Sequence, residues 1–229
     1  NNKVAFNLTD SFLDSFEDSS GILADNSEAE IVGNPAKTIT ATGDVQHSTA
    51  QSKFGASSIY FDGTGDNLQI ADATEFQFNG SYTIDFWFWV SGTASGCFFS
   101  KHQSGVANLG LFINRTAGKI KWQDDKNSIY LDVGSGLNDS AWHHVALVRS
   151  GSGSSNLKLY IDGTLVSTQS GSVAQTQTSN IQIGQYINSS GDDLAGYIDN
   201  YRISNVARWD ADFTPSTTAF TRDDNTLLL

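Results

Sequence analysis

Apolar and polar side chains alternate along most of the chain with the two-residue period of a β-strand. Residues 142–149 carry apolar side chains in both alternating sets, which predicts a strand covered on both faces. Residues 157–161 and 164–168 alternate more simply, and Asp162-Gly163 separates them. Asp-Gly favours a two-residue turn because both of its central positions need a positive φ. The pattern therefore predicts an antiparallel meander over residues 142–168.

The same alternation recurs in short segments bounded by Gly, Ser, Asn and Asp turns, and no segment has the pattern of a long helix. The further strands that we expect cover residues 4–8, 31–32, 38–42, 57–61, 68–70, 82–90, 97–100, 109–114, 119–123, 128–133, 181–184, 196–204 and 226–229. Many short strands with regular turns indicate an all-β antiparallel sandwich rather than βαβ units. Without an internal repeat or a low-complexity linker, residues 1–229 are interpreted as one domain.

Composition narrows the classes of partner. The formal net charge is −12 and the 13 Lys and Arg residues are scattered, so no nucleic-acid partner is expected. No apolar run reaches the roughly 18–20 residues that cross a bilayer, so no membrane insertion is expected. The chain has no methionine and no signal peptide, which indicates a piece of a longer protein. Its one cysteine, Cys97, cannot form an internal disulfide and is predicted to be a small buried hydrophobe.

Six segments in a fixed order carry a resemblance to a known family. They are Lys53-Phe54-Gly55 and residues 57–70, 82–90, 142–166, 181–184 and 196–209. In this order they resemble the laminin G-like jelly-roll branch of the concanavalin A-like lectin/glucanase superfamily. The resemblance implies a two-sheet jelly-roll sandwich that usually binds glycans or proteins and sometimes holds calcium, without identifying the ligand. Residues 207–215, ARWDADFTP, further resemble domains of phage tails and other virion or surface proteins.

The acidic residues depart from the pattern of the glucanase members, which the resemblance associates with paired Glu residues at alternate positions of one strand. A retaining mechanism needs two carboxyl groups roughly 5–5.5 Å apart. The chain has no Glu beyond Glu75, while Asp85 and Asp199 stand alone on their strands. We therefore expect no enzyme, although chemistry with Asp alone stays open.

His143 and His144 invite an interpretation as metal ligands or as a catalytic base. Adjacent strand residues point to opposite faces, so the two side chains cannot chelate one ion together. The resemblance places His144 at a recurring structural position, and we expect it to be buried and hydrogen-bonded, with His143 facing solvent.

Clustered Asp residues suit a hard cation, because Ca²⁺ binds carboxylates together with the carbonyl groups of turns. The candidate calcium ligands are Asp18, Asp62, Asp66 and Asp199. By resemblance, such a calcium would be structural and would lie near the first strands and the strand that contains residues 198–200. The alternative is that Asp62, like Asp162, only stabilises a turn.

A glycan site needs an aromatic platform and planar polar groups. Trp87 and Trp89 share one face of their strand, although a strand so apolar is more often core. Trp122 lies beside a polar turn, and the loop 186–193 combines an aromatic side chain with amides and carboxylates. The candidate carbohydrate-binding residues are Trp122, Asp124, Asp125, Asn127, Tyr186, Asn188, Asp192 and Asp193. The alternative for both groups is a solvated turn.

The leading hypothesis is a non-catalytic, lectin-like recognition module of a viral (phage) or bacterial surface attachment protein. Its partner would be a glycan or glycoconjugate on a cell surface, and display of many copies in a larger assembly would multiply a weak affinity. The alternative is a structural or protein-binding domain of a virion or cell surface without a glycan site. A glycan array separates the two hypotheses.

Overall fold

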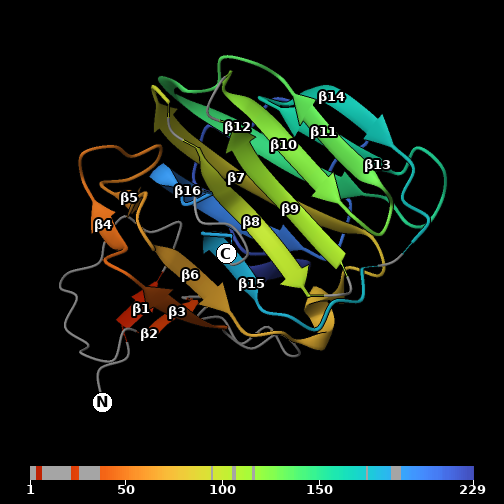
Figure 1. Ribbon diagram of the computed structural model, residues 1–229, viewed down its shortest axis with the longest axis horizontal. Helices are drawn as coiled ribbons and strands as arrows, with labels where there is room; N and C mark the ends of the chain where they lie inside the picture. The colour runs from red at the N-terminus through yellow and green to blue at the C-terminus, as the bar shows by residue number, and fades with distance from the viewer. Residues whose placement is uncertain are drawn as a thin grey trace.

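Two β-sheets pack face to face and enclose the hydrophobic core (Figure 1). The computed structural model describes residues 37–93, 95–104, 107–114, 117–173, 175–186 and 192–229, and the backbone of two earlier strands, Val4–Phe6 and Ile22–Asp25. Within these residues every strand pair is antiparallel except β1 with β2, and the helical structure is one 3₁₀ turn, Thr74–Gln77. No helix in this part of the chain is long and apolar enough to cross a membrane. The predicted all-β antiparallel jelly-roll sandwich is therefore confirmed.

The two sheets are named A and B. Sheet A has the spatial order β1 (Val4–Phe6), β2 (Ile22–Asp25), β3 (Thr38–Thr42), β6 (Asn67–Ile70), β15 (Ile181–Gly184), β8 (Gly96–Gln103), β9 (Ala107–Asn114), β10 (Lys119–Asp124) and β11 (Ile129–Val133). Sheet B has the order β14 (Thr164–Gln169), β13 (Leu157–Ile161), β12 (Asp139–Arg149), β7 (Tyr82–Ser91), β16 (Ala195–Ser204), β5 (Ser58–Asp62) and β4 (Gln46–Ser48), and β17 (Thr226–Leu228) pairs with β16.

The strands predicted from alternation between residues 38 and 229 are all present, with ends shifted by at most three residues. Two short strands, β2 and β4, were not predicted. The described residues of β4 are partly or fully exposed, so it has no apolar alternation to detect. The strand expected at residues 31–32 lies outside the described residues. Cys97 is buried as predicted, and burial raises the pKa of its thiol.

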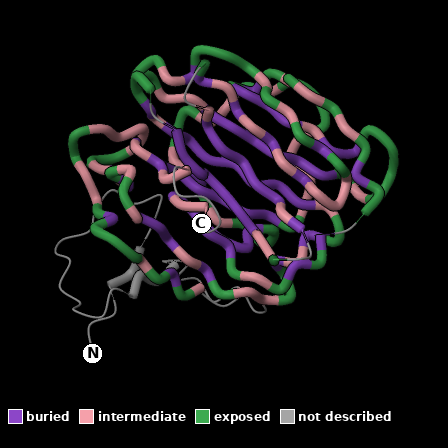
Figure 2. The backbone as a smooth tube through the Cα atoms, viewed as in Figure 1, coloured by how far each residue is buried: buried purple, intermediate pink, exposed green. Residues whose placement is uncertain are grey.

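The core is formed by inward-facing residues of strands from both sheets, and Figure 2 shows buried residues along the middle strands. In β7, Ile84, Phe86 and Phe88 are fully buried, as their shared face predicts. The ring of Phe86 stacks on Tyr201 of β16 at 5.2 Å and contacts Phe98 of sheet A at the same centroid distance. Truncating such a buried ring to alanine typically costs about 3–5 kcal/mol. Aromatic side chains from both sheets therefore interlock in the core.

The predicted meander of β12, β13 and β14 is confirmed. Asp162 and Gly163 have φ values of 50° and 78°, as the two-residue turn requires. The Asp162 carboxylate accepts the backbone N–H of His144 at 2.8 Å, and the Gly163 carbonyl accepts that of Phe213 at 2.9 Å. A Cβ on Gly163 would lie 1.9 Å from the Phe213 carbonyl oxygen, so this position needs glycine for close approach as well as for its φ. The turn thereby anchors the C-terminal segment.

The two histidines point to opposite sides of β12, as strand geometry predicts. His144 is buried as expected, but its ring nitrogens have no hydrogen-bond partner among the described residues, and Nε2 lies 3.5 Å from Asp85. The expectation that His143 faces solvent is wrong, because its side chain is only 15% exposed and its ring nitrogens contact Asp162 at 2.8 Å and Asp139 at 3.1 Å. The hydrogen bond to Asp162 raises the pKa of His143 against the opposing effect of burial, and Asp139 adds to the rise.

Candidate functional site

Four aromatic side chains form one row across the outer face of sheet B. The register places Tyr60 of β5 opposite Tyr197 of β16, Tyr197 opposite Trp89 of β7, and Trp89 opposite Trp142 of β12. The Tyr60 and Tyr197 ring centroids are 4.9 Å apart, and Trp89 meets Tyr197 edge-on at 5.4 Å. All four residues are partly exposed, while their neighbours Ile59 and Phe88 on the same strands are buried in the core. The row is therefore an accessible aromatic strip.

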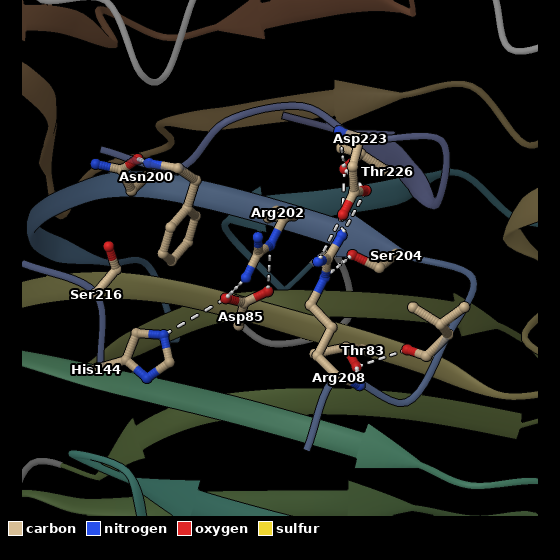
Figure 3. Close-up of polar contacts among 12 residues, drawn as sticks. Thr83, Asp85, His144, Asn200, Arg202, Ser204, Arg208, Ser216, Asp223 and Thr226 are labelled. Carbon is tan, nitrogen blue, oxygen red and sulfur yellow. Dashed lines mark hydrogen bonds and ion pairs between the residues drawn. The ribbon is translucent and has the colours of Figure 1, made fainter. Parts of the chain in front are cut away.

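The C-terminal segment covers the other part of this outer face (Figure 3). Arg202 of β16 binds the buried Asp85 of β7 through hydrogen bonds of 3.0 and 2.8 Å, and its guanidinium carbon lies 4.1 Å from the ring centre of Phe220. Farther along the segment, Arg208 binds Asp223 through two bonds of 3.0 and 2.8 Å. These contacts hold the segment against sheet B and leave the aromatic row partly exposed.

Trp87 and Trp89 consequently have different environments although they share a face of β7. Trp87 is buried against Phe54 and Phe220, and the Lys53 Nζ lies 3.8 Å from its ring centre. Trp89 lies beyond this cover and lines a cavity. Of the two tryptophans, Trp89 is the one that a ligand can reach.

The cavity has a volume of about 550 Å³ and lies at the end of β5 and β7 and the start of β16. It is lined by Tyr60, Asp62, Gly63, Trp89, Ser91, Thr93, Ser95, Asp193, Ala195, Gly196 and Tyr197. Ligand sites in proteins commonly measure roughly 300–1,000 Å³. Three aromatic rings beside hydroxyl and carboxylate groups can contact both an apolar surface and the hydroxyl groups of one ligand.

The cavity is acidic, because Asp62 and Asp193 line it and the described residues of its lining include no Lys, Arg or His. Asp193 Oδ2 accepts the Gly65 N–H at 3.0 Å, whereas Asp193 Oδ1 is buried and has no hydrogen-bond partner among the described residues. Burial, followed by the proximity of Tyr197 and of the carboxylates, raises the pKa of Tyr60, so this phenol stays protonated at neutral pH. The cavity can accept hydrogen bonds from hydroxyl groups, but it offers no cation to an anion.

Beside the cavity, three carboxylates from two turns lie together. Asp44, Asp62 and Asp66 each place a carboxylate oxygen within 4.8 Å of the other two. Asp66 is buried and accepts the backbone N–H groups of Asp44 at 2.8 Å and Asp62 at 2.9 Å. Burial is the main cause that raises the pKa of Asp66. Gly43 allows this approach, because a Cβ there would lie 2.2 Å from Asp66 Oδ1.

This acidic cluster fits a calcium ion. Oxygen ligands lie about 2.3–2.6 Å from Ca²⁺, so two ligands of one ion are at most about 5 Å apart. The oxygens of Asp44, Asp62 and Asp66 satisfy this limit. Two of the predicted ligands, Asp62 and Asp66, thus lie together. Asp44 was not predicted, because its turn lies beside them only through the pairing of β3 with β6, in which Thr42 is opposite Asn67.

Asp199 does not join the cluster, which corrects the expected ligand set. Its buried carboxylate accepts the backbone N–H groups of Lys53 at 2.8 Å and Phe54 at 3.0 Å. Burial raises the pKa of Asp199 to about 6. Asp199 therefore attaches the loop that precedes β5 to strand β16. Asp18 lies outside the described residues.

Trp122 cannot serve as a sugar platform, which corrects a second expectation. It is fully buried in the core, because the inward-facing residues of β10 are Ile120, Trp122 and Asp124. The Asp124 carboxylate accepts the N–H and Nδ2 of Asn127 at 3.0 and 2.9 Å and Gln175 Nε2 at 2.8 Å. For Asp124 and Asn127 the turn interpretation therefore holds.

The remaining predicted residues divide between the two outer faces. On sheet A, Asn108 joins two of them, since its Oδ1 accepts the Tyr186 hydroxyl at 2.9 Å and its Nδ2 donates to Asp125 at 2.9 Å. Asp193 instead lines the cavity at sheet B, and the Asp192 carbonyl accepts the N–H of Cys97 at 3.0 Å. Asn188 lies outside the described residues. The predicted site is thus split, and Tyr60 and Tyr197, which sequence reasoning missed, complete the cavity with Trp89 and Asp193.

Comparison with protein families agrees with the architecture. A laminin G model described as the concanavalin A-like lectin/glucanases superfamily matches residues 62–212. The chain belongs to this family. Comparison with curated proteins finds no significant match.

Solved structures share the fold of this concanavalin A-like chain at low sequence identity. The binding domain of Paraclostridial Mosquitocidal Protein 1 is 13% identical with a TM-score of 0.60, covering 75% of this chain and 44% of that one. The Trypanosoma rangeli sialidase in complex with the inhibitor DANA is 15% identical (TM-score 0.56, 75% and 27% covered). The binding domain of botulinum neurotoxin DC in complex with SialylT is 15% identical (TM-score 0.55, 75% and 43% covered). The chain spans less than half the length of each.

Proposed function

We propose that this chain is a non-catalytic carbohydrate-recognition module whose ligand binds in the cavity at the aromatic row. The observation that carries the proposal is the register of Tyr60, Tyr197 and Trp89 beside Asp62 and Asp193. A sugar ring presents C–H groups that pack on aromatic faces and hydroxyl groups that donate to carboxylates. The lining of the cavity offers both kinds of partner.

The charge of the cavity selects the class of glycan. A sialylated ligand such as the one named for the neurotoxin domain carries a carboxylate, and the cavity lining holds two carboxylates and no cation. Bringing like charges together in a partly buried site is unfavourable. The proposed ligand is therefore a neutral glycan, or a neutral part of a larger glycoconjugate.

A structural calcium ion at Asp44, Asp62 and Asp66 forms a second part of the proposal. Asp62 belongs both to this cluster and to the cavity wall. An ion held there would fix the turn after β5. Its two positive charges would meet three carboxylates, so the cluster would keep a net negative charge, and Asp193 lies outside the cluster. Its expected role is to keep the rim of the cavity in one conformation.

The biological context that we propose is a virion or cell-surface attachment protein that acts outside the cell and displays several copies of the module. Multiple copies convert weak binding at single sites into stable attachment. The sialidase shares the fold, but this chain covers only 27% of it at 15% identity, so the likeness is one of architecture. We expect no turnover when the module is incubated with polysaccharides that it binds.

A glycan array followed by calorimetry on the best neutral ligand tests the proposal. Trp89→Ala should weaken binding by about tenfold or more, equivalent to roughly 1.4 kcal/mol, because it removes one ring of the wall. Tyr130→Ala is the matched control, since Tyr130 is 62% exposed on sheet A and lies away from the cavity. Equal affinity of the two variants refutes the site. If the wild-type protein binds no glycan on the array, the structural or protein-binding alternative is supported.

A further inference from the structure

A small polar groove lies on the outer face of sheet A, on the opposite side of the sandwich from the aromatic cavity. The register aligns Gln69 of β6, Gln182 of β15 and Ser100 of β8 in one row on three adjacent strands, which Figure 1 shows side by side. Ser179, Asn180 and His102 complete a lining that encloses about 140 Å³. The groove shares no lining residue with the aromatic cavity.

Two polar atoms of this groove are buried without hydrogen-bond partners among the described residues. They are Gln182 Oε1 and Ser179 Oγ. Gln182 as a whole is only 7% exposed. Buried polar groups in native proteins are nearly always hydrogen-bonded, and an unpaired one loses its hydration without replacement. An amide oxygen in this state can accept a hydrogen bond from a water or a ligand that enters the groove.

The charge and size of the groove define what can supply that donor. Among the described residues, its lining includes no Asp, Glu, Lys or Arg. The volume is roughly that of four to five water molecules, at about 30 Å³ each in the liquid, which suits a single six-membered ring. The His102 ring forms a fixed wall, because Nδ1 contacts Asn108 Oδ1 and the ring meets Tyr186 edge-on at 5.7 Å.

We infer that this groove is a second ligand site, which takes one neutral sugar residue or a similar uncharged group rich in hydroxyls. One ligand hydroxyl donates to Gln182 Oε1, and another exchanges a hydrogen bond with Ser179 Oγ. Gln69 and Asn180 offer further amide groups to the same ring. With sites on both outer faces, one module can bind two glycan chains at once, so it can bridge neighbouring chains on a surface.

The test follows the side-chain amide signals of Gln69, Gln182 and Asn180 by ¹H–¹⁵N NMR during titration with the methyl glycosides of glucose, galactose, mannose and N-acetylglucosamine. At least one glycoside should shift these signals in a saturable way. Ser179→Ala removes a single hydroxyl and should weaken that binding roughly three- to tenfold, as expected for one hydrogen bond. Gln182→Ala also removes one hydrogen bond and should weaken binding at least as much. Gln123→Ala, on the same face but outside the groove, should leave it unchanged.

Trp89→Ala separates this inference from the proposed function. Shifts of the groove amides that persist in Trp89→Ala support an independent second site, whereas shifts that disappear with Trp89 overturn it. Absence of any saturable shift of the three amides also overturns it, and then bound water alone satisfies Gln182. Binding in the aromatic cavity is read from the Trp89 indole N–H signal in the same spectra, so either site can fail while the other stands.

Discussion

Removing the Arg202 guanidinium should strongly destabilise the fold, because it leaves the buried Asp85 carboxylate with only the longer contact to His144. Asp85 is completely buried, and its carboxylate receives two hydrogen bonds from Arg202. Burial acts to raise the pKa of Asp85, but the contact with His144 and the charge and hydrogen bonds of Arg202 together hold it below its usual value. Breaking one partner of such a buried pair typically costs about 3–5 kcal/mol. We expect a loss of this size for Arg202→Met at pH 7.

The pH dependence of this loss provides a second signature. In the wild type the lowered pKa of Asp85 contributes stability above the unfolded pKa of about 3.9, and this contribution is lost as the pH falls. Without Arg202, burial dominates, the pKa of Asp85 rises, and protonation on folding becomes favourable. The deficit of Arg202→Met should therefore shrink between pH 7 and pH 5. The double variant Asp85→Leu/Arg202→Met should recover much of the stability, because no charge remains to be buried.

Urea denaturation at both pH values measures these effects. Arg208→Met is the comparison. Arg208 also binds Ser204 and Thr226, but the side chain of its partner Asp223 is 45% exposed, so its loss leaves no fully buried carboxylate unpaired and should cost less than Arg202→Met. A loss below about 1 kcal/mol for Arg202→Met, or a double variant as unstable as the single one, would refute the reasoning. Either result would mean that the Asp85 charge is solvated after all.

Three further predictions concern the turns. Calcium at a hundredfold excess over its Kd should raise the melting temperature by the equivalent of about 2.7 kcal/mol, and EDTA should reverse the rise. Asp66→Asn should abolish this rise. A wild-type melting temperature that does not change with calcium contradicts the calcium proposal. Asp162 raises the pKa of His143, so this pair stabilises the fold fully below about pH 6.5 and loses its effect as the pH rises through the raised pKa. In chemical denaturation, the loss of stability in His143→Gln should therefore be larger at pH 6 than at pH 9. Gly163→Ala should cost at least about 1–3 kcal/mol from its positive φ alone, while Gly153→Ala, with open space around its Cβ position, should be nearly neutral in the same assay.

The sequence by itself determined the features that depend on a few consecutive residues. Two-residue alternation placed most strands of both sheets, with β2 and β4 missed, since a strand with one covered face repeats its apolar side chains at that spacing. Asp162-Gly163 specified its turn because positive φ is a local property of those residues. The opposite directions of His143 and His144 followed from the same local geometry.

The tertiary structure decided which faces are covered and which turns meet. Trp87 and Trp89 are equivalent in the alternation of β7. The loop that contains Phe54 and the C-terminal segment that contains Phe220 bury Trp87 and leave Trp89 accessible. Trp122 lies next to a polar turn in sequence, yet its strand phase places it in the core. Asp44 meets Asp62 only through the pairing of β3 with β6. These contacts join residues that are distant in sequence, so they cannot be predicted from the local periodicity of the side chains.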